Sequence, residues 1–169
     1  MVQALSYRDV RDLQVSEGVQ GPIEQLYRED GDRLWRAILF FGGDREVASD
    51  AVAEAFARAL ERADTIRDLR AWVWRVSFRL AARELRRRRM WATASRDASY
   101  EIPEAGVLLA TVMPQLSPRQ RACVVLHYYA GHSQKDVATI LRTSPSAVGV
   151  HLHRARARIR EALEDHDGE

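Results

Sequence analysis

Apolar residues recur at intervals of three and four through most of this chain, which is the periodicity of amphipathic α-helices. In the first half the pattern predicts three helices, over residues 22–41, 44–63 and 68–89. Asp44 and Asp68 stand at the N-caps of the second and third helices, where a short carboxylate accepts hydrogen bonds from the first backbone N–H groups. The third helix is expected to turn an apolar stripe inward, made of Leu69, Trp72, Val73, Val76, Leu80 and Leu85.

Near the C-terminus the pattern predicts two helices joined by a very short turn. Ser133 and Asp136 have the spacing of a capping box at the start of the first helix. Ser144, followed by a proline, begins the second helix, and Val148 and Leu152 form its inward face. This arrangement is typical of a helix-turn-helix, in which the second helix enters the major groove of DNA.

Two further helices, over residues 107–115 and 118–129, precede that pair, and no alternating β-branched run or hairpin signal occurs in the sequence. We therefore predict an all-α protein of two small helical domains joined by a linker, the C-terminal one a four-helix domain containing the helix-turn-helix. The expected order is an N-terminal extension, a first domain, the linker and a second domain, at residues 1–21, 22–90, 91–106 and 107–169.

At 169 residues, with 46% hydrophobic and 30% charged residues, the chain has the composition of a soluble globular protein. A formal net charge of +2 is too small to indicate a nucleic-acid partner by itself. There is no apolar run of about 18 residues, so no membrane insertion is expected. The N-terminus lacks the pattern of a secretory signal, and Cys123 has no second cysteine to pair with. We therefore expect a cytoplasmic protein with a buried thiol.

Positive charge is concentrated near the C-terminus. Between Val137 and Arg160 lie five arginines and no acidic residue. Arg154 and Arg158 are four apart on one helix face, so both can meet DNA phosphates. A solvated arginine-rich helix is the alternative for a charge run alone, but its place in a capped helix-turn-helix favours nucleic-acid binding.

Two blocks of the sequence resemble the extracytoplasmic-function class of bacterial RNA polymerase sigma factors. One extends from Leu26-Tyr27-Arg28 to Arg86-Arg87-Arg88-Arg89, and the other from Leu116-Ser117-Pro118-Arg119 to His153-Arg154-Ala155-Arg156 and beyond. The resemblance implies that the first domain binds the polymerase clamp and recognises and melts the −10 promoter element. The second domain would read the −35 element while holding the polymerase flap, and the linker would follow the RNA-exit path.

The resemblance also implies a polymerase-binding surface on the second helix, formed by Asp50, Ala53 and Glu54. Asp50 and Glu54 are four apart on the expected exposed face and match acidic positions that meet a basic clamp helix in the family. The alternative is that they are ordinary surface carboxylates. The family usually has Gln where this chain has Ala53, which predicts a weaker or shifted clamp contact.

For the −10 element, the third helix carries a basic stripe suited to a DNA backbone, and the loop before it lies where the family builds a pocket for an unpaired base. The expected set is Thr65, Ile66, Arg67, Trp74, Arg75, Arg79, Arg83 and Arg86. Trp74 is interpreted either as a side chain that stacks on a base or as a half-buried one, and the half-buried interpretation is slightly favoured.

For the −35 element, the expected set is Ser133, Lys135, Ser144, Ser146, Ala147, Gly149, Val150, His151, Arg154 and Arg158. The family commonly has Lys, Ser and Arg where this chain has Gly149, Val150 and His151. Ser146 and His151 are then the expected readers of base edges, and Val150 can touch a thymine methyl group. Arg142 replaces the usual glycine of the turn, which predicts a left-handed backbone costing about 1 kcal/mol.

The remaining candidate chemistry is weak. The five histidines have no zinc-ligand spacing, and no nucleophile–base pair or phosphate-binding loop stands out. We expect no enzyme activity, metal, cofactor or small-molecule substrate. The expected partners are RNA polymerase core, promoter DNA and, by resemblance, an anti-sigma factor.

The predicted function is that of a sigma factor, which directs promoter recognition, DNA melting and transcription initiation. The alternative is a free-standing helix-turn-helix transcriptional regulator with a helical ligand-binding or dimerisation domain. Such a regulator would bind duplex DNA by itself and would not need the acidic pair Asp50 and Glu54.

Overall fold

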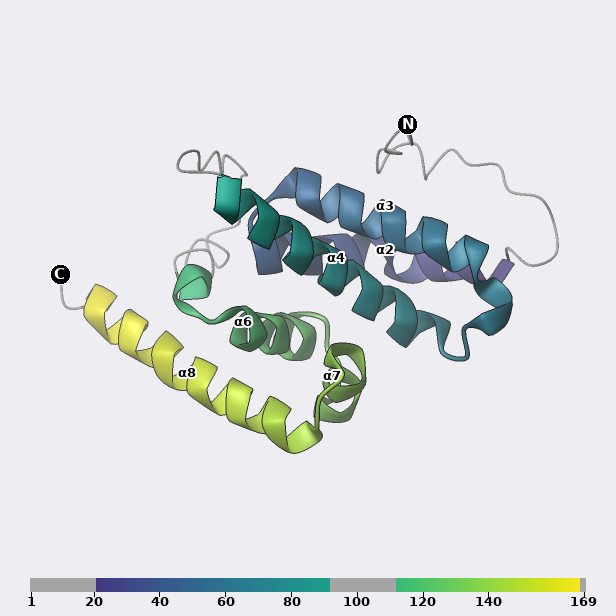
Figure 1. Cartoon of the computed structure of the whole chain (residues 1–169). Coiled ribbons are helices and arrows are strands. Elements are labelled where there is room, and N and C mark those ends of the chain that lie inside the picture. The colour runs from purple at the N-terminus through teal and green to yellow at the C-terminus, as the bar shows by residue number, and fades with distance from the viewer. Residues whose placement is uncertain (1–20, 92–111, 168–169) are drawn as a thin grey trace. The chain divides into compact units, whose positions relative to one another are not determined.

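The computed structural model describes residues 21–91 and 112–167 (Figure 1). The chain divides into two compact units, Met1–Ser95 and Arg96–Glu169. Both units are helical, and no strand occurs in the described ranges, so the predicted all-α class is confirmed. Most of the predicted extension, most of the linker and the start of the predicted helix at 107–115 lie outside the described residues.

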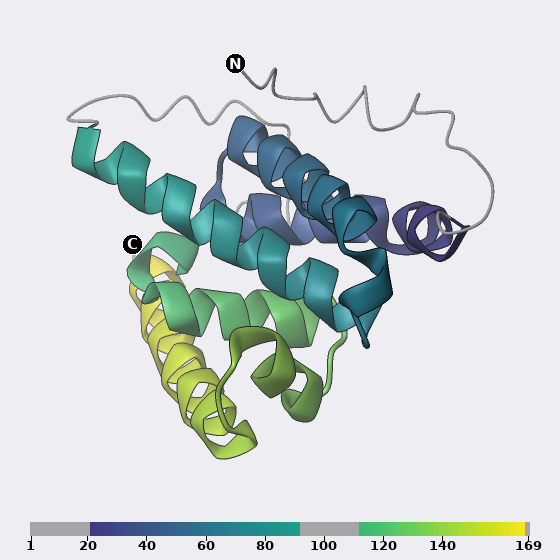
Figure 2. The ribbon, with the colours of Figure 1, turned by 45° about the vertical axis from the view of Figure 1, so that its right-hand side comes forward.

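Three long helices form the first unit: α2 (Gly21–Gly42), α3 (Arg45–Glu61) and α4 (Leu69–Trp91), with a 3₁₀ turn η1 (Ala63–Thr65) between the last two. Each of the three helices packs against the other two, as the second view shows (Figure 2). The centre of the unit is filled by fully buried side chains: Leu34, Ile38, Val47, Val52, Phe56, Val73 and Trp74.

Local signals define the helix ends as the sequence predicts. The Asp44 carboxylate accepts a hydrogen bond from the backbone N–H of Val47 at 2.9 Å, and Asp68 accepts one from Ala71 at 2.9 Å. The turn between α2 and α3 passes through a glycine, Gly43, with a φ of +71° that other residues rarely adopt. The N-cap predictions for α3 and α4 are therefore confirmed.

The predicted inward stripe of α4 is only partly correct. Val73 and Val76 are buried, but Leu69, Trp72, Leu80 and Leu85 remain partly exposed. The buried face also takes in Trp74, Ser77, Phe78 and Ala81. Because α4 packs against two helices rather than one, its buried face is wider than a single stripe and is displaced toward Trp74 and Phe78.

The second unit contains η2 (Met113–Gln115), α6 (Pro118–Val124), η3 (Val125–Tyr129), α7 (Gln134–Leu141) and α8 (Pro145–Asp167). The long helix α8 packs against both α6 and α7. The single helix predicted over 118–129 widens after α6 into the π-helical turn η3, where the N–H of Ala130 donates to the carbonyl of Val125 at 2.9 Å. None of the described helices has the length and apolar character needed to cross a membrane.

Candidate nucleic-acid and polymerase interfaces

The helix-turn-helix of the second unit begins with a complete capping box. The Ser133 hydroxyl accepts from the backbone N–H of Asp136 at 3.1 Å, and the Asp136 carboxylate accepts from the backbone N–H of Ser133 at 3.1 Å. The Ser133 hydroxyl also donates to the Asp136 carboxylate at 2.6 Å; this bond, and after it the bond from the backbone N–H of Ser133, lowers the pKa of Asp136. The predicted start of α7 is thus confirmed, and Ser133 serves as the N-cap of α7.

The turn between α7 and α8 passes through Arg142, whose φ of 52° and ψ of 58° are left-handed. It is the one non-glycine residue with positive φ among the residues that the structure describes. The N–H of Thr143 then donates to the carbonyl of Ala138 at 2.9 Å, which closes the C-terminus of α7. The left-handed conformation predicted at Arg142 is therefore confirmed.

Apolar contacts orient α8 so that one face is available at the surface. Val148, Leu152 and Ala155 are buried, and α8 packs on α7 along this side. The opposite side exposes Ser146, Arg154 and Val150, whose side chain is 48% exposed. A large apolar side chain held in water is a candidate contact for a base methyl group.

Several residues of the predicted −35 set have partners within the unit. The Ser144 hydroxyl caps α8 by accepting from the N–H of Ala147 at 3.1 Å, and it shares a hydrogen bond with the Ser146 hydroxyl at 2.9 Å. Lys135 is exposed, while Ala147, Gly149 and His151 are partly exposed. On α8, Ser146, Val150 and Arg154 of the predicted set are exposed and His151 is partly exposed.

Gln134 is a neighbour of this surface that the sequence did not indicate. It is exposed at the first position of α7, and its Oε1 lies 3.4 Å from the place where a Cβ on Gly149 would be. The missing side chain of Gly149 therefore leaves room that α7 partly occupies.

Arg158 was predicted to contact phosphate, but its guanidinium already donates to the backbone carbonyl of Gln115 at 2.9 Å. The contact joins α8 to η2 and was not indicated by the sequence. Arg154, one turn earlier, is exposed.

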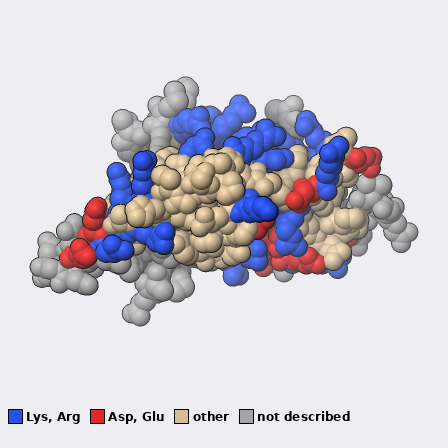
Figure 3. Space-filling model, turned by 90° about the horizontal axis from the view of Figure 1, so that it is seen from below, with Lys and Arg blue, Asp and Glu red and all other residues tan. Residues whose placement is uncertain are grey.

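The predicted −10 residues of the first unit lie on the loop after α3 and along α4. Thr65 and Arg67 are exposed and Ile66 is partly exposed. On α4, Arg79, Arg83 and Arg86 are exposed, whereas Arg75 is half-buried. On the face drawn in Figure 3, Lys and Arg side chains cover more surface than Asp and Glu, so the small net charge conceals local basic surfaces.

The structure corrects the prediction for Trp74. Its side chain is fully buried, and its indole N–H donates to the carboxylate of Asp30 at 3.0 Å. Neither a half-buried ring nor a ring that stacks on a base fits this position. The helical spacing alone could not reveal it, because the acceptor lies on α2.

On α3 the acidic pair is placed as predicted, whereas its neighbour Ala53 is not a surface residue. Asp50 and Glu54 are exposed, and Glu54 pairs with Arg58 at 2.6 Å. Ala53 is only 4% exposed, so its methyl group contributes to packing and does not reach a partner. Partial burial, and then repulsion from Glu46, raise the pKa of Asp50.

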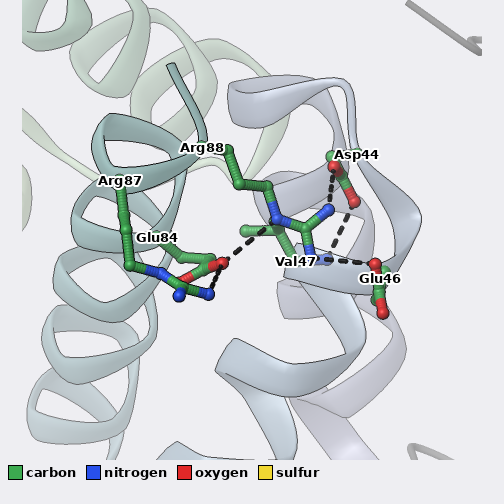
Figure 4. Close-up of polar contacts among 6 residues, drawn as sticks. All are labelled: Asp44, Glu46, Val47, Glu84, Arg87 and Arg88. Carbon is green, nitrogen blue, oxygen red and sulfur yellow. Dashed lines mark hydrogen bonds and ion pairs between the residues drawn. The ribbon is translucent and has the colours of Figure 1, made fainter. Parts of the chain in front are cut away.

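A network of ion pairs connects the last turns of α4 to the N-terminus of α3 (Figure 4), and its charged groups also act on Asp50. The Arg88 guanidinium contacts Asp44 at 2.7 Å, Glu46 at 2.8 Å and Glu84 at 3.1 Å. Hydrogen bonds from Arg87 and then Arg88 lower the pKa of Glu84 to about 2. The arginine run near the end of α4 is thus partly used to fasten α4 to the N-terminus of α3.

The described residues hold no group of three or more His, Cys, Asp or Glu side chains that could bind a metal ion. The one cysteine, Cys123, is buried, and burial raises the pKa of its thiol to about 11. Its thiol therefore stays protonated at neutral pH.

Comparison with known proteins gives a consistent set of relatives. The family model described as "Sigma-70, region 4" matches residues 107–159. The ECF RNA polymerase sigma factor SigL of Mycobacterium tuberculosis is 30% identical over 155 residues, which cover 83% of this chain and 88% of SigL. The RNA polymerase sigma-E factor of Streptomyces avermitilis is 32% identical over 154 residues, which cover 85% of this chain and 86% of that factor.

Solved structures have the same fold. CnrH, in complex with the cytosolic domain of CnrY, is 26% identical with a TM-score of 0.69, over 86% of this chain and 90% of CnrH. The sigma factor RpoE of Bartonella quintana, in complex with the anti-sigma factor NepR, matches with a TM-score of 0.68 at 20% identity. That match covers 83% of this chain and 96% of RpoE.

Proposed function

Because this chain belongs to the extracytoplasmic-function RNA polymerase sigma factors, we propose that its two units divide promoter recognition between them. A sigma factor binds RNA polymerase core and directs it to promoters, where transcription begins.

The second unit, which contains the region 4 match, reads the −35 element through the exposed face of α8. The observation that carries this assignment is the orientation of α8, whose buried Val148 and Leu152 leave the opposite face in water. Val150 touches a thymine methyl group there, and Ser146 and His151 offer hydrogen bonds to base edges. Arg154 binds a phosphate and so positions the helix without adding sequence preference.

The first unit binds the polymerase and opens the −10 element. Asp50 and Glu54 face a basic surface of the polymerase clamp, which is supported by their exposure and by their positions on one side of α3. The loop residues Thr65, Ile66 and Arg67 hold an unpaired base. The exposed arginines of α4 follow the DNA backbone beside that loop: Arg79, Arg83 and Arg86.

A regulatory partner is part of the proposal. CnrH is held by the cytosolic domain of CnrY in its solved structure, and its likeness to this chain extends over both units. We infer that an anti-sigma protein in the cytoplasm binds this chain and keeps it from the polymerase until a signal releases it.

The test is transcription from candidate promoter fragments by purified core enzyme, with and without this protein. We expect specific initiation only when the protein is present, and only weak duplex binding by the protein alone. Tight and sequence-specific duplex binding without polymerase, together with no initiation, would contradict the proposal and favour a free-standing regulator.

A further inference from the structure

A buried carboxylate on α2 holds the beginning of α4. Asp30 is 3% exposed, and its Oδ2 accepts hydrogen bonds from the Arg70 guanidinium at 2.7 Å and from the Trp74 indole at 3.0 Å. Arg70 also pairs with Glu29 at 3.1 Å. A bond from an arginine to a buried carboxylate is among the strong side-chain hydrogen bonds, so α2 fixes the first turns of α4 at this point.

Other side chains contact the Trp74 ring in addition to the hydrogen bond from its N–H to Asp30. The Arg33 guanidinium, also on α2, lies 5.6 Å from the ring centroid. The Phe78 ring is stacked at 6.4 Å with an interplanar angle of 17°. Because the indole is enclosed on these sides, α4 cannot slide along α2 without breaking the bond to Asp30.

The loop at residues 65–67, which is proposed to hold an unpaired base, leads directly into the first turn of α4, where Arg70 binds Asp30. At its first end, the N–H and the hydroxyl of Thr65 both donate to the carbonyl of Arg62, at 2.9 Å each. At its second end, Asp68 caps α4 through its bond from Ala71. Arg70 lies within this capped first turn, so a shift of the turn moves Asp68 and carries Arg67 with it.

We propose that Asp30, acting through Arg70 and Trp74, is a positioning residue that sets how well the loop at residues 65–67 discriminates the unpaired promoter base. The proposal rests on the function proposed above for that loop. Asp30 does not touch DNA, since it is buried beneath α4. Its effect is geometric, because a recognition pocket must be held to within about 0.5 Å to keep its selectivity.

The test compares the full-length protein and its variants in the polymerase holoenzyme, using fork-junction DNA with a single-stranded −10 segment. Binding is measured for four probes that differ only in the unpaired base, and the readout is the ratio of the strongest affinity to the weakest. If Asp30 has a purely structural role, its substitution lowers the affinity for all four probes by the same factor and leaves that ratio unchanged. A positioning role lowers the ratio itself.

The informative variants are Asp30→Asn, which keeps the acceptor for Trp74 but weakens the pairing with Arg70, and Arg70→Ala. The Arg70 side chain is 47% exposed, so Arg70→Ala remains a usable variant if Asp30→Asn fails to fold. Arg70→Lys is the conservative rescue. Arg28→Ala is the control, because it removes an exposed ion pair with Glu24 elsewhere on α2.

We expect Asp30→Asn and Arg70→Ala to lower the discrimination ratio by about three- to tenfold, with Arg70→Lys between them and the wild type. Arg28→Ala should leave the ratio unchanged. An unchanged ratio in both Asp30→Asn and Arg70→Ala would overturn the proposal. A wild-type holoenzyme that shows no base preference at all would instead overturn the function proposed for the loop.

Discussion

The guanidinium of Arg158 donates a hydrogen bond to the backbone carbonyl of Gln115 at 2.9 Å, which ties the terminal helix α8 to the 3₁₀ turn at the start of the described second unit. Arg154 lies one turn earlier on α8 and is exposed. The sequence assigns both arginines to DNA phosphates, but of the two only Arg158 has a contact with a distant residue within the described part of the chain, and removing Arg158 would break it. The two residues should therefore respond differently to the same substitution.

Replacing Arg154 by alanine should weaken promoter binding by the holoenzyme about equally for all −35 sequences, because a phosphate contact carries no base preference. The slope of log affinity against log salt should fall by about 1.

Arg158→Ala should, unlike Arg154→Ala, also lower the free energy of unfolding by about 1 kcal/mol, since the bond to Gln115 is lost. Urea unfolding and salt-dependent binding check both statements, and equal stability of the two variants would contradict the structural role of Arg158.

The left-handed turn at Arg142 offers a stability prediction. Arg142→Gly should raise the free energy of unfolding by about 0.5–1 kcal/mol, because glycine adopts a φ of 52° without the steric cost borne by a side chain. Gly131→Ala is the matched opposite change, since Gly131 has a φ of +72° and open space around its Cβ position. It should lower the free energy of unfolding by about 1 kcal/mol. Opposite signs in urea unfolding are expected, and the same sign for both would refute the strain argument.

Structural features that depend on a few neighbouring residues could be predicted from the sequence. The caps at Asp44, Asp68 and Ser133, and the left-handed turn at Arg142, depend on a few neighbouring residues, and each was predictable from the sequence. The exposed face of α8 was predictable for the same reason, because the spacing of Val148 and Leu152 defines its inward face.

The missed contacts join residues far apart in the chain. Arg88 and Asp44 are 44 positions apart, as are Trp74 and Asp30, and Arg158 and Gln115 are 43 apart. Helical periodicity places each side chain on a face but does not say which helix covers that face. For this reason Ala53 and Trp74 were assigned to partners, although both are buried by neighbouring helices.

Val150 should determine part of the −35 preference. Val150→Ser should reduce the preference for thymine at one position of the element by about fivefold, because the hydroxyl group cannot replace an apolar contact with the thymine methyl group. Val150→Ile is the matched control, since it keeps an apolar side chain at the same exposed place and should keep the preference. Holoenzyme binding to promoters with each base at that position is the measurement. An unchanged preference in Val150→Ser would exclude Val150 as a base contact.

The acidic pair on α3 should be necessary for polymerase binding. Asp50→Arg with Glu54→Arg should weaken the affinity for core enzyme about tenfold or more, because two exposed negative charges would become positive charges facing a basic surface. Transcription should fall in proportion and recover at high protein concentration. Glu24→Arg with Glu61→Arg makes the same change of net charge at exposed positions outside the proposed surface and should bind core normally. Equal loss in both double variants would point to net charge rather than to a defined contact.

The ion-pair network at the end of α4 should make stability depend on pH in acid. The folded protein holds the pKa of Glu84 at about 2, below its ordinary value of 4.5, chiefly through the hydrogen bond from Arg87. A carboxyl group with a lowered pKa stabilises the fold fully above its unfolded pKa, and that stabilisation is lost as the pH falls from about 4.5 toward 2. Because water screens these partly exposed ion pairs, Glu84→Gln should cost no more than about 1 kcal/mol at pH 7, and this difference from the wild type should shrink steadily below pH 4.5.

Urea unfolding of both proteins at several pH values between 7 and 3 measures that difference directly. Glu61→Gln serves as the control for removing an exposed carboxylate at the end of α3, outside the network of Arg88. Arg88→Gln should also lower the stability at pH 7, because it breaks the contacts with Asp44, Glu46 and Glu84 while leaving the pair of Glu84 with Arg87 in place. A difference between wild type and Glu84→Gln that stays constant down to pH 3 would mean that the charge of Glu84 does not stabilise the folded protein.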